Sequence, residues 1–492
     1  MAARSILQHT GIPPSWLEKR PKIPSRNWLI FLSVTSSVVG LYLYDRQQCK
    51  HIRQYYVDKV KHLAEEPMNP FEFPRKVSVY AAKWPGDEDY DQSMRYFRKY
   101  VKVCKFSLLI YFKKKKRLKF PLLQPILVAA AIDYDMVPGK RHGDIAKRIA
   151  DDIRVRRRFD LGLEHETELP LPSYKPPAER RRLELEGGII IIGRPTFKEF
   201  MSGLQKGWTE GLEKVDRDEV LADILENDTH FDEPEDHHES IYDNDATSTT
   251  ASHQVPTQPS SPSPMFSSFQ IQPSTPPPQK KGSFPVSNDT NQPPSVIPPL
   301  PPLLLVPFTD YIGISQIPLM IWGFFNQRHK VRAGAEAGYR LVMRESQPIE
   351  VPENINDLTL SSSSPSTDDV PPTNLGDLDF DKGVESYYRK SLGSLQEDTE
   401  KARKKYYENL APQLNTARQL ARGTREPTKA ELDNPPPTEV ELRAERFKKE
   451  RRWRDDMEGW DIIKPSSSVR WDERYRSALR IFTTPNDEDD KA

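Results

Sequence analysis

The chain of 492 residues carries 72 basic and 72 acidic side chains, so its formal net charge is zero. It has no basic domain, no RNP-like aromatic pattern and no zinc-finger spacing, and we therefore exclude nucleic acid as a partner. Its two cysteines, Cys49 and Cys104, are too few for an intramolecular disulfide framework or a thiolate zinc site. The 46 prolines and two long polar stretches indicate fewer folded domains than the length alone would allow.

An uncharged apolar run occupies residues 28–44, after a proline-containing leader at 1–27. As a helix its 17 residues would measure about 25 Å, the short end of what a bilayer core requires. Core helices rarely lack a polar face over this length, and no A-x-A-like cleavage site follows. We therefore predict an uncleaved transmembrane helix rather than a buried helix or a secretory signal. The predicted anchor side chains are Trp28, Leu29, Ile30, Phe31, Leu32, Val38, Val39, Leu41, Tyr42, Leu43 and Tyr44.

Charge does not orient this anchor. Residues 1–27 and residues 45–62 each contain five lysines and arginines, so the positive-inside rule favours neither side.

Strand and helix patterns then alternate along residues 45–227, which we predict to be a juxtamembrane helix and an α/β domain continuing at 301–345. Strands are expected at 75–84, 126–137, 189–192 and 303–306, and helices at 45–66, at 89–101, after Gly143 and from Pro195. Repeated strand–helix units predict a mostly parallel sheet with covering helices.

Residues 103–124 form a basic and apolar insert that separates a predicted helix from the next predicted strand. Its first codons can encode an intron 5′ end, its last can end in CAG, and its length preserves the reading frame. A membrane-surface segment is the alternative. We favour a retained intron and assign no function to Cys104 or to the run of lysines.

Two stretches, 228–300 and 346–380, are rich in Ser, Pro and acidic residues and are predicted to be disordered linkers. The C-terminal region, 381–492, is predicted to form charged helices, the last of them running through residues 471–482. Its sparse aromatic side chains either bind a partner or pack on the α/β domain. The candidate partner contacts are Tyr387, Tyr388, Tyr406, Tyr407, Trp471, Tyr475 and Phe482.

A short apolar segment at 317–325 allows two interpretations. It can lie in the plane of a membrane or pack against the α/β domain, and we favour packing.

Three motifs suggest chemistry and fail on inspection. Residues 188–196 match a phosphate-binding loop only superficially, because four isoleucines indicate a buried strand and Pro195 replaces the magnesium-binding hydroxyl. His237, His238 and Glu239 lie in a segment predicted to be disordered, where a rigid metal site cannot form. Asp133 and Asp135 lie near the end of a predicted central strand without a catalytic partner. We therefore predict no catalytic residue, no metal site and no cofactor.

Several longer segments together resemble one family. These segments are GIPPSWLEKRPKIPSRNWLIFLSV, YDRQQCKHIRQYYVDKV, KVSVYAAKWPGD, GGIIIIGRPTFKEFMSGLQKGW, ARKKYYENL, ARGTREPTKAE and WDERYRSALRIF. The chain resembles the fungal subunit, of about fifty-four kilodaltons, of the carrier translocase in the mitochondrial inner membrane. It departs from that family chiefly at 103–124, which favours the intron interpretation.

The resemblance implies a single-pass protein of the mitochondrial inner membrane, with its N-terminus in the matrix and its large domain in the intermembrane space. It implies a non-enzymatic scaffold that helps to dock small hexameric chaperones carrying multispanning carrier precursors. Expected partners are the other translocase subunits, those chaperones, the precursors and inner-membrane lipid. Two alternatives remain: a membrane-tethered α/β enzyme or small-ligand-binding domain, and an assembly factor for other inner-membrane complexes.

Overall fold

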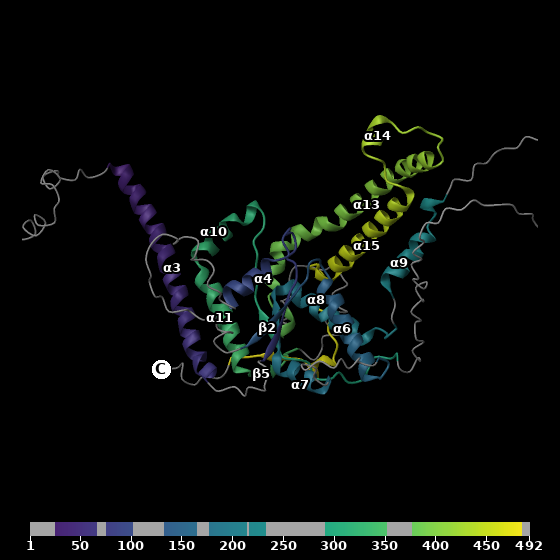
Figure 1. The fold of residues 1–492 in the computed structure, drawn as a ribbon. Helices are drawn as coiled ribbons and strands as arrows, with labels where there is room; N and C mark the ends of the chain where they lie inside the picture. The colour runs from purple at the N-terminus through teal and green to yellow at the C-terminus, as the bar shows by residue number, and fades with distance from the viewer. Residues whose placement is uncertain are drawn as a thin grey trace, which may run out of the picture. The chain divides into compact units, whose positions relative to one another are not determined.

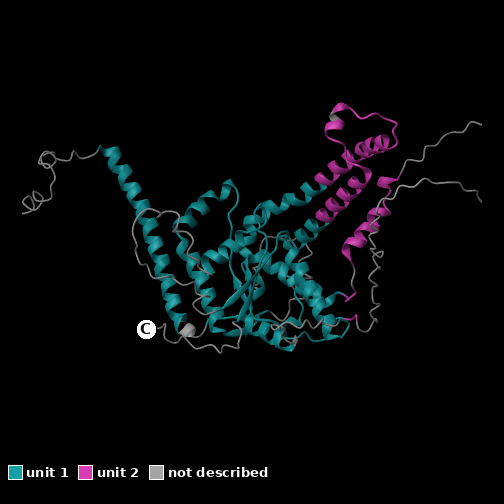
Figure 2. Ribbon diagram, in the orientation of Figure 1, with its two compact units in different colours: residues 1–210, 293–400, 454–492 teal, residues 211–292, 401–453 magenta. Residues whose placement is uncertain are grey.

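The computed structural model describes residues 25–65, 75–101, 132–164, 177–213, 216–232, 291–351 and 376–484 (Figure 1). The chain forms two compact units (Figure 2). Unit 1 comprises residues 1–210, 293–400 and 454–492, and unit 2 comprises residues 211–292 and 401–453. Each unit is therefore built from segments that are far apart in the sequence.

A parallel sheet forms the centre of unit 1. Among the described residues it has six strands in the order β2-β1-β3-β4-β6-β5. Every neighbouring pair is parallel except β5 and β6, which confirms the predicted mostly parallel α/β fold. The strands are β1 (Lys76–Ala81), β2 (Asp133–Pro138), β3 (Ile189–Ile192), β4 (Leu303–Val306), β5 (Ser346–Pro348) and β6 (Arg480–Phe482).

The isoleucines of β3 show why both faces of the sheet are covered. Ile190 and Ile192 pack into one hydrophobic cluster, and Ile191 packs into another. Successive strand side chains point to opposite faces, so a continuous apolar run supplies contact surface to helices on both sides.

Helices α6 (Asp144–Asp160) and α8 (Gly193–Thr209) pack against one face. Two glycines of α8 allow the two helices to approach closely. A Cβ atom at Gly203 would lie 2.7 Å from the carbonyl oxygen of Ala146, and one at Gly207 would lie 2.8 Å from the Cβ of Ile153. Any larger residue would push α6 away from α8.

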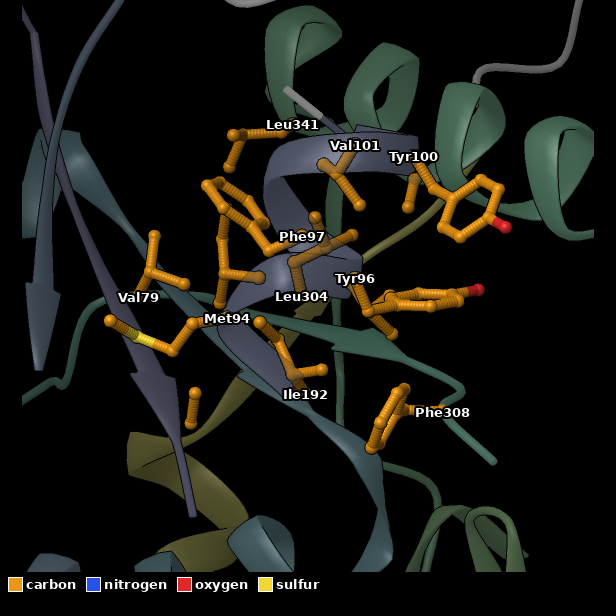
Figure 3. Packing of buried hydrophobic residues seen from close by; sticks show 14 of the residues in the cluster. Val79, Met94, Tyr96, Phe97, Tyr100, Val101, Ile192, Leu304, Phe308 and Leu341 are labelled. Carbon is orange, nitrogen blue, oxygen red and sulfur yellow. The ribbon is translucent and has the colours of Figure 1, made fainter. Parts of the chain in front are cut away.

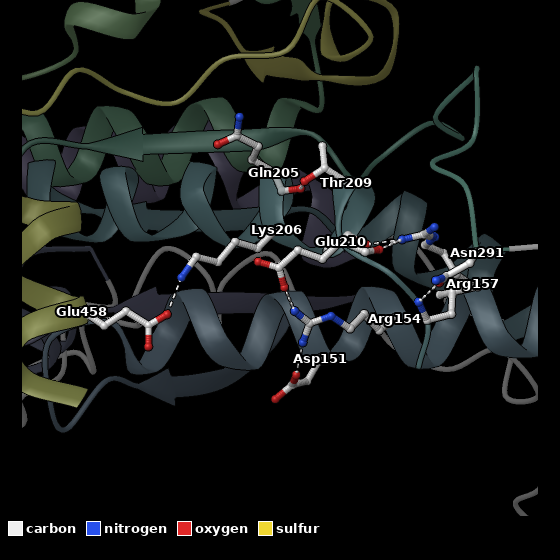
Figure 4. A network of polar contacts seen from close by, with 11 residues as sticks. Asp151, Arg154, Arg157, Gln205, Lys206, Thr209, Glu210, Asn291 and Glu458 are labelled. Atoms are coloured by element: carbon white, nitrogen blue, oxygen red, sulfur yellow. Dashed lines mark hydrogen bonds and ion pairs between the residues drawn. The ribbon is translucent and has the colours of Figure 1, made fainter. Parts of the chain in front are cut away.

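Polar side chains close this helix contact at the end of α8 (Figure 4). The Arg157 guanidinium donates hydrogen bonds to the carbonyl oxygens of Gly207 and Glu210, each at 2.8 Å. Arg154 forms ion pairs with the Glu210 and Asp151 carboxylates. Carbonyl groups at the end of α8, which lack helical partners, are thereby satisfied.

The opposite face is covered by α4 (Gln92–Tyr96), the π-helical turn η2 (Phe97–Val101) and α11 (Gln327–Met343). Phe97 and Val101 are fully buried and lie among Ile192, Leu304 and Leu341 (Figure 3). The predicted helix at 89–101 is confirmed from Gln92 onward.

The remaining helices of unit 1 include the long N-terminal helix. They are α3 (Arg26–Glu65), α7 (Pro177–Gly187), η4 (Ile314–Gln316), α10 (Ile317–Phe325), η6 (Gly376–Asp379), η7 (Lys382–Val384) and α16 (Tyr475–Ala478). Two helices are shared between the units. Helix α13 (Glu385–Ala421) begins in unit 1 and ends in unit 2, and α15 (Glu439–Ile463) begins in unit 2 and ends in unit 1.

The C-terminal segment departs from its prediction. The helix predicted through 471–482 is wrong, because only Tyr475–Ala478 is helical and Leu479 adopts an extended conformation. Residues 480–482 then enter the sheet as β6. The linker predicted at 346–380 is also wrong at both ends. Residues 346–348 form β5 and the Ile349 side chain is buried, while residues 376–379 form η6 and the Leu378 side chain is buried.

Unit 2 contains α9 (Arg217–Glu226), η3 (Thr229–Phe231), α14 (Lys429–Asp433) and the distal parts of α13 and α15. Its hydrophobic cluster joins Phe231 to Leu410, Leu414 and Leu442. The linker predicted at 228–300 is therefore wrong at its ends, because Phe231 and Ile297 are both buried.

Several predictions fall outside the described residues. These are the leader at 1–24, the insert at 103–124, the first part of the strand predicted at 126–137, and the linker segments 233–290 and 352–375.

A buried ion cluster links α8 to α13. One Glu385 carboxylate oxygen lies 2.8 Å from the Arg194 guanidinium and 2.8 Å from the Lys198 ammonium. All three side chains are nearly inaccessible. Burial lowers the pKa of Lys198, while its hydrogen bond to Glu385 opposes that shift. Glu385 is therefore the carboxylate that contacts both buried cations directly.

We predict that Glu385→Gln destabilises unit 1 by about 3–5 kcal/mol, because it removes the carboxylate that contacts both buried cations. Denaturant unfolding of the full chain in detergent micelles measures this loss. Lys382→Gln is the control, since its ion pair with Asp379 leaves the lysine side chain 54% exposed and contributes at most about 1 kcal/mol. Equal midpoints for both variants would contradict the proposed strength of the cluster.

Candidate membrane-facing site

The first half of α3 projects from the body (Figure 1). Its apolar segment, within residues 26–62, is long enough to cross a bilayer, and none of its most apolar window is buried. The predicted anchor side chains are exposed along 28–44, apart from Tyr42, which is partly covered. A fully exposed apolar surface of this length is unfavourable in water and suits a hydrocarbon environment.

The second half of α3 packs against α11. Cys49 and Val60 are buried in the core cluster, and Tyr56 lies against Tyr339 with 5.9 Å between the ring centroids. The exposed apolar half of α3 and the half that packs in the body therefore form one continuous helix, with no intervening loop.

Asp45 lies between these two halves of α3 and binds the start of α11. Its carboxylate accepts hydrogen bonds from the backbone N–H groups of Gln327 at 3.2 Å and Arg328 at 3.1 Å. These amides begin α11, so the carboxylate caps the positive end of that helix. Asp45 is only 2% exposed although it directly follows the apolar run. Sequence reasoning missed this role, because nothing local to Asp45 identifies Gln327 as its partner.

Aromatic and cationic groups gather beside Asp45. The rings of Tyr42 and Phe324 stack with their centroids 5.6 Å apart. The Arg46 guanidinium lies 4.8 Å from the Tyr42 ring and 5.6 Å from the Phe324 ring, and it also donates to the Gln327 side chain. This cluster ties the end of the apolar run to α10.

Helix α10 is not buried, and the packing favoured for residues 317–325 is wrong. None of its side chains is buried, and Trp322 is 70% exposed. Apolar character alone does not distinguish a core helix from one that faces lipid.

The predicted partner contacts are mostly internal. Tyr388, Tyr475 and Phe482 are buried in the core of unit 1, and Tyr406 is buried in unit 2. For these four residues the prediction of a partner surface is wrong, because their side chains already pack within their own unit.

The other three predicted contacts are partly accessible. Tyr387 stacks edge-on against Tyr311, Tyr407 lies within unit 2, and Trp471 packs edge-on against Tyr475.

The candidate chemical motifs take structural positions. Residues 189–192 are a strand followed directly by α8, as predicted. Asp133 and Asp135 were expected near the carboxyl end of a central strand, which is wrong: both lie in the first half of β2, at the edge of the sheet. Asp135 is exposed and pairs with Lys76 at 3.4 Å.

A shallow cleft beyond β2 is lined by other residues, among them Lys140, Asp144 and Arg148. The described part of the chain holds no cluster of three or more potential metal ligands. His237, His238 and Glu239 lie outside it.

Two buried titratable side chains lie where α6 begins. The Glu199 carboxylate accepts a hydrogen bond from the Ile145 N–H at 3.2 Å. Burial raises the pKa of Glu199 to about 8, and the backbone N–H donors of α6 oppose this shift. Burial lowers the pKa of His142 to about 4. Neither residue lines the cleft. Glu199 belongs to the packing of α8 on the start of α6, and His142 lies against Gly459 of α15.

Comparison with known proteins identifies the family. Residues 5–109 and 120–369 match the family described as inner membrane protein import complex subunit Tim54. The chain belongs to this family. The mitochondrial import inner membrane translocase subunit TIM54 of Cryptococcus neoformans var. neoformans serotype D (strain JEC21) is 35% identical over 98% of this chain and 95% of its own length. The corresponding subunit of Aspergillus oryzae is 33% identical over 39% of this chain and 40% of its own length. That of Candida albicans is 30% identical over 44% and 56%, respectively.

Membership of the Tim54 family makes the chain a subunit of a protein import complex in the mitochondrial inner membrane. The single long apolar helix found among the described residues is consistent with this location.

The family match omits residues 110–119, which lie inside the predicted retained intron at 103–124. We predict that mature mRNA lacks these 22 codons, so that Lys102 is followed by Pro125. Sequencing of the spliced transcript measures this directly. A mature message that still encodes residues 103–124 would contradict the prediction.

We predict that Asp45→Ala loosens the start of α11 and lowers stability by about 1–2 kcal/mol, because two N–H groups lose their cap. Hydrogen–deuterium exchange of the first turn of α11 measures the effect in the membrane-embedded chain. Gln47→Ala is the matched control, since that side chain is exposed on the same helix. Unchanged protection in the Asp45 variant would show that the carboxylate does not hold the two helices together.

Proposed function

We propose that the chain is a non-enzymatic scaffold and docking subunit of the translocase that inserts multispanning carrier proteins. In this proposal α3 is its single membrane span, and the domain after α3 lies in the intermembrane space. The observation that carries the proposal is the continuity of α3 with the folded body through Asp45 and α11. A body attached without a flexible joint can hold bound complexes at a defined place beside a channel, and tethering raises their local concentration.

Unit 2 is our candidate for the surface that docks the small chaperone hexamers. Its core is small, and the helices around it carry many charged side chains, including exposed Lys404, Lys405 and Glu408 on α13. Exposed charges suit the rim of a transient interface, where they steer association and set specificity. In this proposal exposed charged side chains of unit 2 contact the chaperones, in place of the aromatic residues that the structure buries.

The structure determines how the larger helical part of unit 2, residues 401–453, can be removed while residues 211–292 stay in the chain. Deletion of the whole C-terminal region would remove β6, Tyr388 and Tyr475 from the core of unit 1, and it would therefore test folding rather than docking. Within unit 1, α13 and α15 lie side by side, with the Thr399 hydroxyl oxygen 3.4 Å from the Met457 sulfur. A short Gly/Ser linker can therefore join Glu400 to Arg454 in place of 401–453.

We predict that this replacement releases the chaperone hexamers while the protein stays in the inner membrane. Co-purification of the chaperones with the translocase should be lost, because their docking surface is absent. Import of carrier precursors should fall, while import of presequence-bearing precursors is unchanged. Protease added after rupture of the outer membrane should still digest the body.

The matched control replaces only 423–428, the exposed turn after α13, by the same linker. It should retain both the chaperones and carrier import. Chaperone co-purification equal to wild type in the longer replacement would refute docking on residues 401–453 of unit 2. Equal loss of both import pathways would favour the assembly-factor alternative.

A further inference from the structure

Helix α10 lies in the connection between β4 and α11. It is apolar on every side: from Ile317 to Phe325 the sequence is IPLMIWGFF. Ile321 is 54% exposed, Trp322 is 70% exposed and Ile314, just before the helix, is 87% exposed. A helix that is apolar on all sides is stable inside a protein core or in lipid, where nonpolar atoms surround it.

Polar contacts hold α10 at both ends. Before the helix, the Gln316 side chain donates to the Tyr387 carbonyl oxygen at 2.9 Å and accepts from the Ile312 N–H at 3.0 Å. After the helix, the first amides of α11 bind Asp45. The exposed surface of α10 is therefore presented in a defined direction.

That surface adjoins the anchor. Phe324 stacks on Tyr42, and Figure 1 shows α10 beside α3. Two arginines mark the polar end of the shared apolar surface: Arg46 lies over Tyr42 and Phe324, and Arg328 lies 6.0 Å from the Tyr44 ring. Aromatic rings with neighbouring arginines are typical of the headgroup level of a bilayer.

We propose that α10 is a second membrane contact, which inserts into the bilayer leaflet next to the body and is surrounded by lipid. This inference rests on the proposed function of α3 as the anchor. At about 14 Å, α10 is too short to span a bilayer, so it lies within one leaflet, on the acyl-chain side of the headgroups. Lipid is favoured over a protein groove because a helix docked in a groove keeps a polar outer face, and α10 has none.

Site-specific photocrosslinking tests the proposal with the full chain. The photoreactive residue p-benzoylphenylalanine replaces Trp322, and the protein is reconstituted into vesicles of phosphatidylcholine, phosphatidylethanolamine and cardiolipin. Two matched positions are probed in parallel: Ile30 in the anchor and Val296, which is 72% exposed on the body of unit 1. Mass spectrometry then identifies the adducts, and the same three variants are irradiated in native inner membranes.

We expect lipid adducts at 322 and at 30, in similar yield, and none at 296. Lipid adducts at 30 without any at 322 would overturn the role of α10 and leave the anchor intact. Adducts at 322 to another translocase subunit in native membranes would show that the helix binds protein instead. Absence of lipid at 30 as well would refute the anchor and, with it, this inference.

Discussion

The contact between the Asp45 carboxylate and the first amides of α11 joins the apolar and the folded parts of the chain. A carboxylate removed from water is unfavourable by itself, and two N–H donors at the positive end of a helix offset that cost. The contact also sets the register of α3 against α11, so that Cys49 and Val60 enter the core. The folded body therefore begins where the apolar run ends, without a joint that could uncouple them.

Local patterns were enough to predict the parallel sheet and its main helices. Each of these patterns can be read from a short window of sequence. Examples are the four isoleucines of β3, the helical spacing of α6 and the uncharged run at 28–44. The site depends on contacts across long stretches of sequence, namely Asp45 with Gln327 and Tyr42 with Phe324, and the buried ion cluster depends on Glu385 with Arg194. A carboxylate or a tyrosine looks the same in sequence whether or not such a partner reaches it.

The C-terminal return of the chain shows a different limit. Residues 471, 475, 478 and 482 have helical spacing, yet β6 begins at Arg480. A three-residue strand is too short to display its own period, and here the neighbouring strands decide the conformation. After the charged helices α13 and α15, the chain returns to unit 1, where β6 lies between β4 and β5 in the sheet. The C-terminal part of unit 2 is therefore inserted between two segments of unit 1 and is not a terminal extension.

The misprediction of α10 has the same physical origin as its proposed function. Hydrophobicity records only that a helix avoids water, and both a protein core and a lipid leaflet satisfy that requirement. Geometry separates the two, because α10 is held at both ends and exposed between them, beside the anchor. A spanning helix alone sets the depth of an attached body but leaves its tilt unconstrained. A second apolar contact to one side of that helix restricts the tilt of unit 1.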